Sequence, residues 1–366
     1  MACIDAPAQY QQLCYDADAF MDSKIVQWTP ITYTPLKFVV EHFALAGSLI
    51  REDIETDNMF FNAMMELNPD IFSFSIIPQM YDTGKPGYDN AVTLCRANNK
   101  EIIFAYHVGG GLALPFPTFD HIPTISEYIT KEKTYLGYYI SNYNPEYIYV
   151  AVEPLTQNQR TGASFTANDW LSIITETCNY VKSISPNTQT GAMLLQTSSL
   201  DFSVYERIKN LNNLDIIGFN IYGDGPFYDE YTGSVCTGDC VGTRMNEIQL
   251  NRKKAIINET WTGVESTGIL GSLWTEDSDA KWIKMITYYA QKNKSYMIMP
   301  FFTLYFIDYY PYTYPPTQEF FINLLNFLTN SLQLGKRSKV FYAYRDMINE
   351  VRANTCPTSI CSFAII

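Results

Sequence analysis

Short apolar runs alternate with amphipathic segments along most of the chain. The apolar runs are rich in β-branched and aromatic residues and end in polar or Gly/Pro loops, a pattern typical of buried parallel strands. Eight such runs cover residues 37–45, 70–78, 101–111, 146–154, 189–197, 214–223, 254–261 and 295–306. Segments with apolar residues at helical spacing follow several of them, at 88–99, 166–184, 202–212, 277–293 and 317–332.

This alternation predicts the fold class. Eight strands alternating with helices over about 250–300 residues have the size and rhythm of a single (β/α)₈ TIM barrel of the α/β class. A doubly wound open sheet is the alternative, but no Gly-rich phosphate loop follows the first strand. We expect an N-terminal extension at 1–36, the barrel at 37–335, and an added C-terminal helix (338–354) within a Cys-containing tail, 336–366, packed on the barrel. Thr166 is expected to cap the helix that follows it.

The carboxyl ends of the strands are where a barrel of this kind places its chemistry. The polar residues at the predicted strand ends are Glu41, His42, Gln79, His107, Glu153, Gln196, Asn220, Tyr222, Glu259 and Asp308. Glu153 ends the fourth strand and Glu259 the seventh, on opposite sides of an eight-stranded barrel, so both side chains can face one cleft. Two carboxyl groups about 5–5.5 Å apart across a cleft are the apparatus of retaining glycoside hydrolysis, one as proton donor and the other as nucleophile.

Three segments resemble a known clan of enzymes. "VAVEPL" (150–155) is similar to the acid/base motif of the (β/α)₈ glycoside hydrolases that carry the acid/base Glu after strand four and the nucleophile Glu after strand seven, clan GH-A. "IINETW" (256–261) resembles the clan's nucleophile strand, and "DIIGFNIYG" (215–223) its sixth strand. The resemblance covers residues 37–332. It implies a glycosidase that cleaves β-linked oligo- or polysaccharides, with Glu153 as acid/base, Glu259 as nucleophile and Tyr222 as the phenol that orients the nucleophile.

Val152 departs from this pattern. The clan usually has Asn before the acid/base Glu, reaching the sugar 2-hydroxyl, and Val cannot make that bond. A substrate without a 2-hydroxyl at this point is one explanation. The alternative function is a catalytically decayed barrel that binds glycans or serves a structural role on a surface or particle.

Other candidate residues lie near the same strand ends. His107 precedes three glycines that permit close backbone approach to a ligand, although a packed histidine is the other interpretation. Asn220 is a candidate substrate contact. Trp261 and the aromatic segment 304–316, with Tyr305, are candidate sugar-stacking platforms, or the segment forms an oligomer contact. Asp308 is a candidate for hydrogen bonds to sugar hydroxyls. Glu265 is a weaker nucleophile candidate.

Charge and composition exclude several classes of protein. The formal net charge of −13 repels a phosphate backbone, so we expect no nucleic-acid partner. No apolar run approaches the 18 or more residues of a membrane span. The three His residues show no metal-ligand spacing, and no Walker loop, dinucleotide fingerprint or Ser elbow is present. We therefore expect no metal and no cofactor, and a carbohydrate as the partner.

Eight cysteines bear on the compartment. Three close pairs are candidate disulfides, Cys3 with Cys14, Cys236 with Cys240 and Cys356 with Cys361, while Cys95 and Cys178 are expected as buried thiols. A zinc site from the last two pairs is the rival interpretation, although neither pair has the two-residue spacing of a zinc knuckle. Disulfides indicate an extracellular or secreted protein, whose signal peptide is then missing from "MACIDAPAQYQQ"; the cytoplasm of a hyperthermophile or a virus particle is the alternative.

Overall fold

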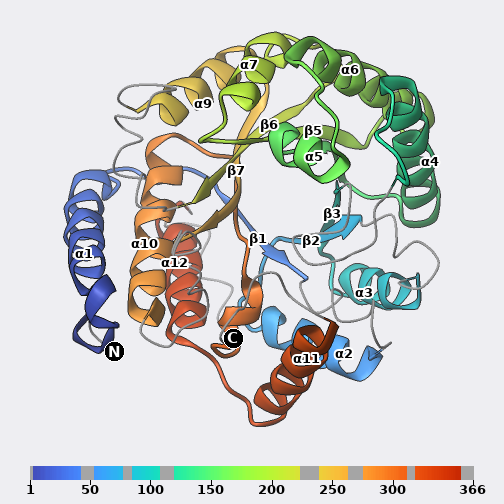
Figure 1. Cartoon of the computed structure of the whole chain (residues 1–366). Coiled ribbons are helices and arrows are strands. Elements are labelled where there is room, and N and C mark those ends of the chain that lie inside the picture. The colour runs from blue at the N-terminus through green and yellow to red at the C-terminus, as the bar shows by residue number, and fades with distance from the viewer. Residues whose placement is uncertain are drawn as a thin grey trace.

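A closed barrel of eight parallel strands forms the centre of the molecule (Figure 1). The structure is a computed structural model and describes residues 3–42, 53–76, 85–107, 119–222, 239–262, 275–310 and 318–355. The strands are β1 (Lys37–Glu41), β2 (Ile71–Ile76), β3 (Glu101–Tyr106), β4 (Tyr147–Val152), β5 (Gln189–Leu195), β6 (Ile216–Tyr222), β7 (Lys254–Trp261) and β8 (Met297–Pro300). Each strand pairs with its sequence neighbour and β8 closes on β1, so the predicted (β/α)₈ barrel is confirmed.

Helices surround the barrel. In the described residues they are α1 (Ala8–Trp28), α2 (Ile54–Met65), α3 (Lys85–Ala97), α4 (Ile125–Tyr143), α5 (Pro154–Thr161), α6 (Ala167–Ile184), α7 (Ser199–Ile208), α9 (Cys240–Leu250), α10 (Glu276–Lys292), α11 (Gln318–Gln333) and α12 (Lys339–Thr355), with 3₁₀ turns η1 (Cys3–Asp5) and η6 (Thr303–Phe306). Thr166 caps α6 as predicted: its hydroxyl accepts from the Asp169 N–H, and the Asp169 carboxylate accepts from the Thr166 N–H.

The eighth strand is shorter than the predicted run of 295–306. It ends at Pro300, and the chain turns into η6 three residues later. Proline has no N–H to donate to a neighbouring strand, and after one more bond, from the Phe301 N–H to the Thr260 carbonyl at 3.2 Å, the chain leaves the ladder although the residues beyond it are apolar. The apolar pattern cannot distinguish this buried turn from a strand.

Side chains fill the barrel interior. Alternate residues of the strands point inward and form one apolar cluster that includes Val39, Ile103, Tyr149, Val152 and Met193. The intervening residues point outward into the larger cluster beneath the helices. The barrel is therefore a packed scaffold, and its strand ends are held rigidly.

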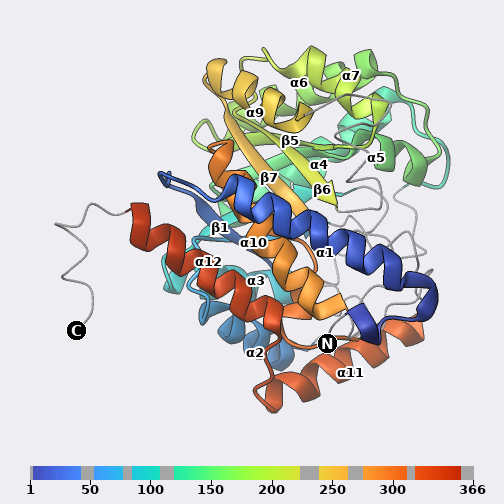
Figure 2. The same ribbon diagram turned by 90° about the vertical axis from the view of Figure 1, so that its left-hand side faces the viewer.

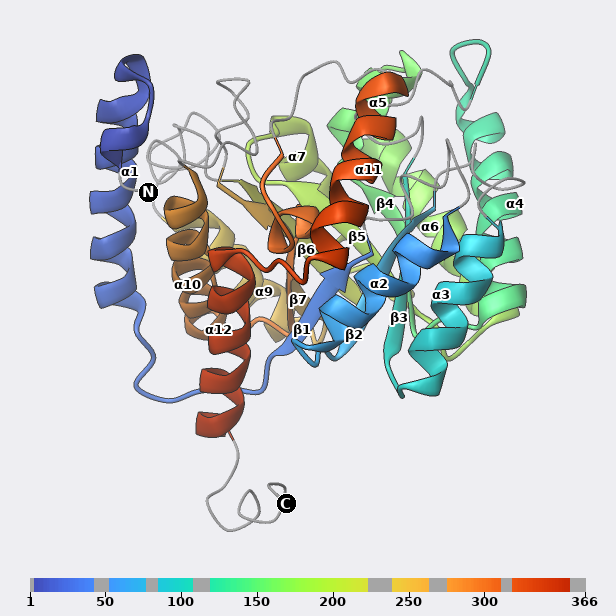
Figure 3. The same cartoon turned by 90° about the horizontal axis from the view of Figure 1, so that it is seen from below.

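Helix α12 packs on the seam between β1 and β8. The Tyr344 phenol donates to the carbonyl of Val39 on β1 and contacts the carbonyl of Ile298 on β8 at 3.3 Å. The helix also packs beside α10, on the side away from α1 (Figures 1 and 3). It thus covers the barrel where the first and last strands meet, whereas α11 lies beside α2.

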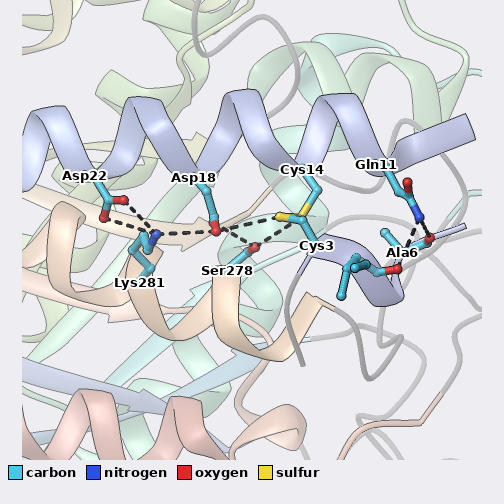
Figure 4. The surroundings of a disulfide bond; sticks show 9 residues. Cys3, Ala6, Gln11, Cys14, Asp18, Asp22, Ser278 and Lys281 are labelled. Atoms are coloured by element: carbon cyan, nitrogen blue, oxygen red, sulfur yellow. Dashed lines mark hydrogen bonds and ion pairs between the residues drawn. A yellow bond between two sulfur atoms is a disulfide. The ribbon is translucent and has the colours of Figure 1, made fainter. Parts of the chain in front are cut away.

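The N-terminal extension is held on the outside of α10. Figure 2 shows α1 running alongside α10. A disulfide joins Cys3 to Cys14, as predicted, and nearby Ser278 of α10 donates a 3.2 Å hydrogen bond to Asp18 (Figure 4). Lys281 pairs with Asp18 at 3.4 Å.

The remaining cysteines divide into two groups. Cys95 and Cys178 are buried free thiols, as expected. Cys240 is disulfide-bonded, while Cys236, Cys356 and Cys361 lie outside the described residues.

Candidate active site

Glu153 stands at the turn from β4 into α5. Its backbone is left-handed, with φ 52° and ψ 76°, a conformation that costs a residue with a Cβ about 1–2 kcal/mol. Gln157 supports the turn: its backbone N–H donates to the Glu153 carbonyl at 2.9 Å and its side-chain amide donates to the Val152 carbonyl at 2.6 Å. The Tyr128 phenol donates to the Gln157 side chain in turn. These contacts fix the direction in which the Glu153 side chain leaves the strand.

Both carboxylate oxygens of Glu153 accept hydrogen bonds. The Asn220 amide nitrogen, from β6, donates to Oε1 at 2.8 Å, and the Thr156 hydroxyl donates to Oε2 at 2.7 Å. Asn220 is fully buried, so this contact lies in a largely water-free part of the barrel. The predicted Asn220 therefore reaches the acidic group itself.

Glu259 lies on β7 with only 5% of its surface exposed. The Tyr222 phenol, at the end of β6, donates to its Oε2 at 2.6 Å. The contact is the one that the sequence resemblance implies for these two positions.

Irregular strand pairing precedes both glutamates. On β4 the register with β5 shifts between Tyr149 and Ala151. On β7, Ile257 pairs with Phe219 and Glu259 with Asn220, which leaves Asn258 as an extra residue. A β-bulge of this kind changes which side of the sheet the following residues face. As a result Asn258 and Glu259, although adjacent in sequence, both contact β6 side chains of the site.

Burial dominates the electrostatics of Glu259. It raises the pKa of this carboxyl well above 4.5, and the negative charge of Glu153 raises it further. The Tyr222 hydrogen bond and the Arg160 guanidinium act in the opposite direction, while Glu41 adds to the rise. Glu153 is therefore one of the charged groups that act on Glu259.

Glu41 is a third carboxyl group in the same part of the barrel. It ends β1, and strand alternation places it on the interior side with Val39. Burial raises its pKa to about 7, although Ser73 and Ser75 oppose the shift, the latter through a 3.0 Å hydrogen bond. The neighbouring His42 is buried among phenylalanines, and burial lowers its pKa to about 4.

His107 and Asp201 are two further titratable groups at the strand ends. His107 follows β3 and is partly buried, and burial followed by the charge of Arg160 lowers the pKa of its imidazole to about 3. Asp201 accepts from the backbone N–H groups of Leu195 and Leu155, at 2.7 Å and 3.0 Å. It thereby joins the end of β5 to the start of α5, and burial raises its pKa to about 7.

Three predicted substrate contacts have partners within the protein. Trp261 and Tyr305 are 1% and 0% exposed and pack on each other with ring centroids 5.9 Å apart, so neither presents an open face for a sugar. Asp308 accepts from Ser331 at 2.7 Å and pairs with Lys336 at 2.6 Å. Within the described residues, the two aromatic side chains pack in the core, and Asp308 links the chain after η6 to α11 and the residues that follow it. Gln79 and Glu265 lie outside the described residues.

The sequence patterns did not identify two side chains of the candidate site. Thr156 lies three residues beyond Glu153, and the helical spacing after Pro154 is a signal that could have found it. Asn258 forms a glycosylation sequon with Glu259 and Thr260, and its inward direction depends on the bulge, which leaves no local signal. Within the described residues, no cluster of three or more His, Cys, Asp or Glu side chains could hold a metal ion.

Fold and site together define a (β/α)₈-barrel protein with a pair of interacting glutamates at the ends of β4 and β7. No protein-family model matches the sequence, and no curated protein matches it. Among solved structures, the chain is similar to the exo-beta-1,4-mannosidase Op5Man5 from Opitutaceae bacterium strain TAV5, with a TM-score of 0.61 and 10% identity. The match covers 89% of this chain and 62% of that protein, so this chain spans less than two thirds of its length.

Two further structures are more distant. The endo-beta-1,4-mannanase from Thermotoga petrophila has a TM-score of 0.49 at 9% identity, over 84% of this chain and 78% of that one. The endo-1,4-beta-mannanase from Rhizomucor miehei has a TM-score of 0.47 at 12% identity, over 74% and 86%. At 10% identity, the likeness to the exo-beta-1,4-mannosidase shows a shared fold. The two mannanases have TM-scores below 0.5 and add no further argument. Within the described residues, no helix is both long enough and apolar enough to cross a membrane.

Proposed function

We propose that the protein is a retaining glycoside hydrolase that cleaves a β-linked oligo- or polysaccharide by double displacement. The observation that carries the proposal is the paired arrangement of Glu153 and Glu259, each at a strand end and each hydrogen-bonded by a β6 side chain. We expect their carboxyl groups to lie about 5–5.5 Å apart, the spacing of retaining enzymes.

In the first step an ionised oxygen of Glu259 attacks the anomeric carbon. The bond from that carbon to the glycosidic oxygen breaks, and Glu153 gives its proton to the departing oxygen. The product is a glycosyl ester of Glu259. In the second step Glu153, now ionised, takes a proton from water, whose oxygen attacks the anomeric carbon and releases Glu259.

The local contacts suit these roles. Glu259 must be ionised to attack, and the Tyr222 hydroxyl favours that form against the effect of burial. Glu153 must exchange a proton in each step, and its position at a strained turn held by Gln157 limits its movement. His107 remains a candidate contact for substrate hydroxyls, since its low pKa keeps the ring neutral.

The substrate class and the compartment are parts of the same proposal. The shared fold with an exo-beta-1,4-mannosidase supports a β-linked sugar chain as the substrate. The disulfide between Cys3 and Cys14 supports an extracellular or secreted location. We further propose that residues 37–335 form the catalytic unit.

Hydrolysis of a panel of β-linked oligosaccharides and aryl β-glycosides tests the proposal. We expect Glu153→Gln and Glu259→Gln to lower kcat/KM by about 10³-fold or more, as the loss of a proton-transfer group or a nucleophile does. Azide should rescue Glu259→Gly by forming the α-glycosyl azide and Glu153→Gly by forming the β-anomer. Wild-type rates in both Gln variants would refute the assignment.

The second candidate is a barrel that binds glycans without cleaving them. Val152 favours it, because this apolar side chain is buried in the barrel interior and offers no hydrogen bond. Tight binding of an oligosaccharide without any turnover by the wild-type protein would support this candidate instead.

A further inference from the structure

Asn258 makes a hydrogen bond that the proposed reaction does not yet explain. It is 3% exposed and occupies the extra position of the bulge on β7. Its amide nitrogen donates to the side-chain oxygen of Asn220 at 3.0 Å. The nitrogen of that same Asn220 amide donates to Oε1 of Glu153 at 2.8 Å. The three side chains form a directed chain of hydrogen bonds from β7 through β6 to the end of β4.

The direction of this chain matters because the two ends of an amide are chemically opposite. An Asn side chain presents a donor at nitrogen and an acceptor at oxygen, and a rotation by 180° exchanges them. Asn220 has one partner at each end, and both contacts are buried, where an unpaired polar group is costly. The donor from Asn258 occupies the Asn220 oxygen and so leaves the nitrogen facing Glu153.

We propose that Asn258 is a positioning residue that fixes the orientation of the Asn220 amide, so that a donor and never an acceptor faces Glu153. The inference rests on the proposed function, since it matters only if Glu153 transfers the proton. With the Asn220 nitrogen on Oε1 and the Thr156 hydroxyl donating to Oε2, the Asn220 amide offers no acceptor for the proton of a protonated Glu153. That proton is then available to the substrate oxygen.

Without Asn258, the Asn220 amide is free to rotate. Its oxygen would then accept the Glu153 proton, which stabilises the protonated acid but directs the proton away from the substrate. The groups that also bear on this site are Glu259 and Glu41 from β7 and β1, Asp201 from α7, Arg160 from α5, His107 after β3 and Tyr222 from β6. These groups are unchanged in all variants below. Differences between the variants therefore reflect the orientation of the Asn220 amide.

A double-mutant cycle tests the inference through kcat/KM. We expect Asn258→Ala to lower kcat/KM on the order of tenfold for a substrate with a poor leaving group, and to move the basic limb of its pH profile upward. A dinitrophenyl glycoside needs no proton on its leaving group and should lose little. In an Asn220→Ala background the Asn258→Ala change should not lower kcat/KM further, because Asn258 acts on Glu153 through the Asn220 amide, which is then missing.

Thr156→Val is the matched control. It removes the other donor to Glu153 without involving Asn258, so its effect should multiply with that of Asn258→Ala. The inference is wrong if the effects of Asn258→Ala and Asn220→Ala on kcat/KM multiply. It is also wrong if kcat/KM falls equally for substrates with good and poor leaving groups. Should the alanine variant not fold, Asn258→Leu keeps the side-chain volume and removes the donor.

A second measurement needs no turnover, so it separates failure of this inference from failure of the proposed function. The side-chain NH₂ signals of Asn220 in a ¹⁵N spectrum, assigned with Asn220→Ala, report what the amide contacts. Glu153→Gln should move these signals in the wild-type background and move them much less in Asn258→Ala. An equal response in both backgrounds overturns the inference, even if the wild-type protein cleaves no glycoside.

Discussion

The Tyr222 phenol donates a 2.6 Å hydrogen bond to Oε2 of Glu259 on the adjacent strand. This hydrogen bond lowers the pKa of Glu259, although burial and the charge of Glu153 still hold that pKa well above 4.5. A nucleophile must be ionised, so the proposed activity should appear only as pH rises through this raised pKa. The acidic limb of the kcat/KM profile is therefore expected well above pH 4.5.

Tyr222→Phe removes that contact and keeps the ring. Because the hydrogen bond favours the ionised form, its loss should raise the pKa of Glu259 and move the acidic limb upward by about one pH unit. Activity near the acidic limb should fall about tenfold, with a smaller loss at high pH. A pH–rate profile of the variant checks this. An acidic limb that moves downward would contradict the assignment of Tyr222 as a donor to the nucleophile.

Glu41 should make the protein less stable at alkaline pH. Burial raises its pKa from 4.5 to about 7 in the fold, so the folded protein binds this proton more tightly than the unfolded chain. The contribution to stability is complete below pH 4.5 and is lost as pH rises through about 7. Denaturant unfolding at pH 5 and pH 8 should show a difference on the order of 1–3 kcal/mol that shrinks in Glu41→Gln.

The matched control for Glu41 is Glu66→Gln, at the end of α2. Glu66 is exposed and pairs with Arg337, so Glu66→Gln removes one negative charge without changing the buried interior. An equal change in both variants would mean that net charge, rather than the burial of Glu41, sets the slope.

Glu153 should be a strained residue. Its left-handed backbone, at φ 52°, favours glycine. We expect Glu153→Gly to be more stable than Glu153→Gln by about 1 kcal/mol, because only the first substitution relieves the strain. Chemical denaturation of the two inactive variants measures the difference. A less stable glycine variant would show that side-chain contacts to Asn220 and Thr156 outweigh the strain.

The disulfide between Cys3 and Cys14 should act on stability and leave catalysis unchanged. It closes a loop with a sequence separation of 11 and holds η1 against α1, on the outer side of α10. Replacing both cysteines by serine should cost about 2–3 kcal/mol of stability, the range expected for a short loop. The kcat should stay at the wild-type value. A fall in kcat would indicate that the N-terminal helix supports the active site through α10.

Much of the candidate site could be predicted from the sequence because the patterns that indicate it extend over only a few neighbouring residues. The strand runs, the ends of β4 and β7 and the cap at Thr166 each depend on a few neighbouring residues. Eight strands in order then place Glu153 and Glu259 at one end of a barrel without further information. Tyr222 and Asn220 follow from the same counting, since they lie two residues apart on β6 and share a face.

Other features depend on partners far away in the chain. The apolar pattern suggests that Trp261 and Tyr305 lie at the barrel mouth, but only the packing of β7 against η6 decides that both are buried. The pattern also continues through Pro300, where the missing N–H ends β8. From the sequence, Asp308 is a candidate cleft residue. In the structure its carboxylate pairs with Lys336 and accepts a hydrogen bond from Ser331.

The clearest division lies within a single tripeptide. The sequence "NET" at 258–260 determines that a carboxylate stands near the end of the seventh strand. Regular alternation would turn Asn258 and Glu259 to opposite faces. Only the pairing of β7 with β6 inserts the bulge that lets Asn258 reach Asn220 while Glu259 reaches Tyr222. Alternation is a property of one strand, whereas register is a property of two, so the tertiary structure alone could decide it.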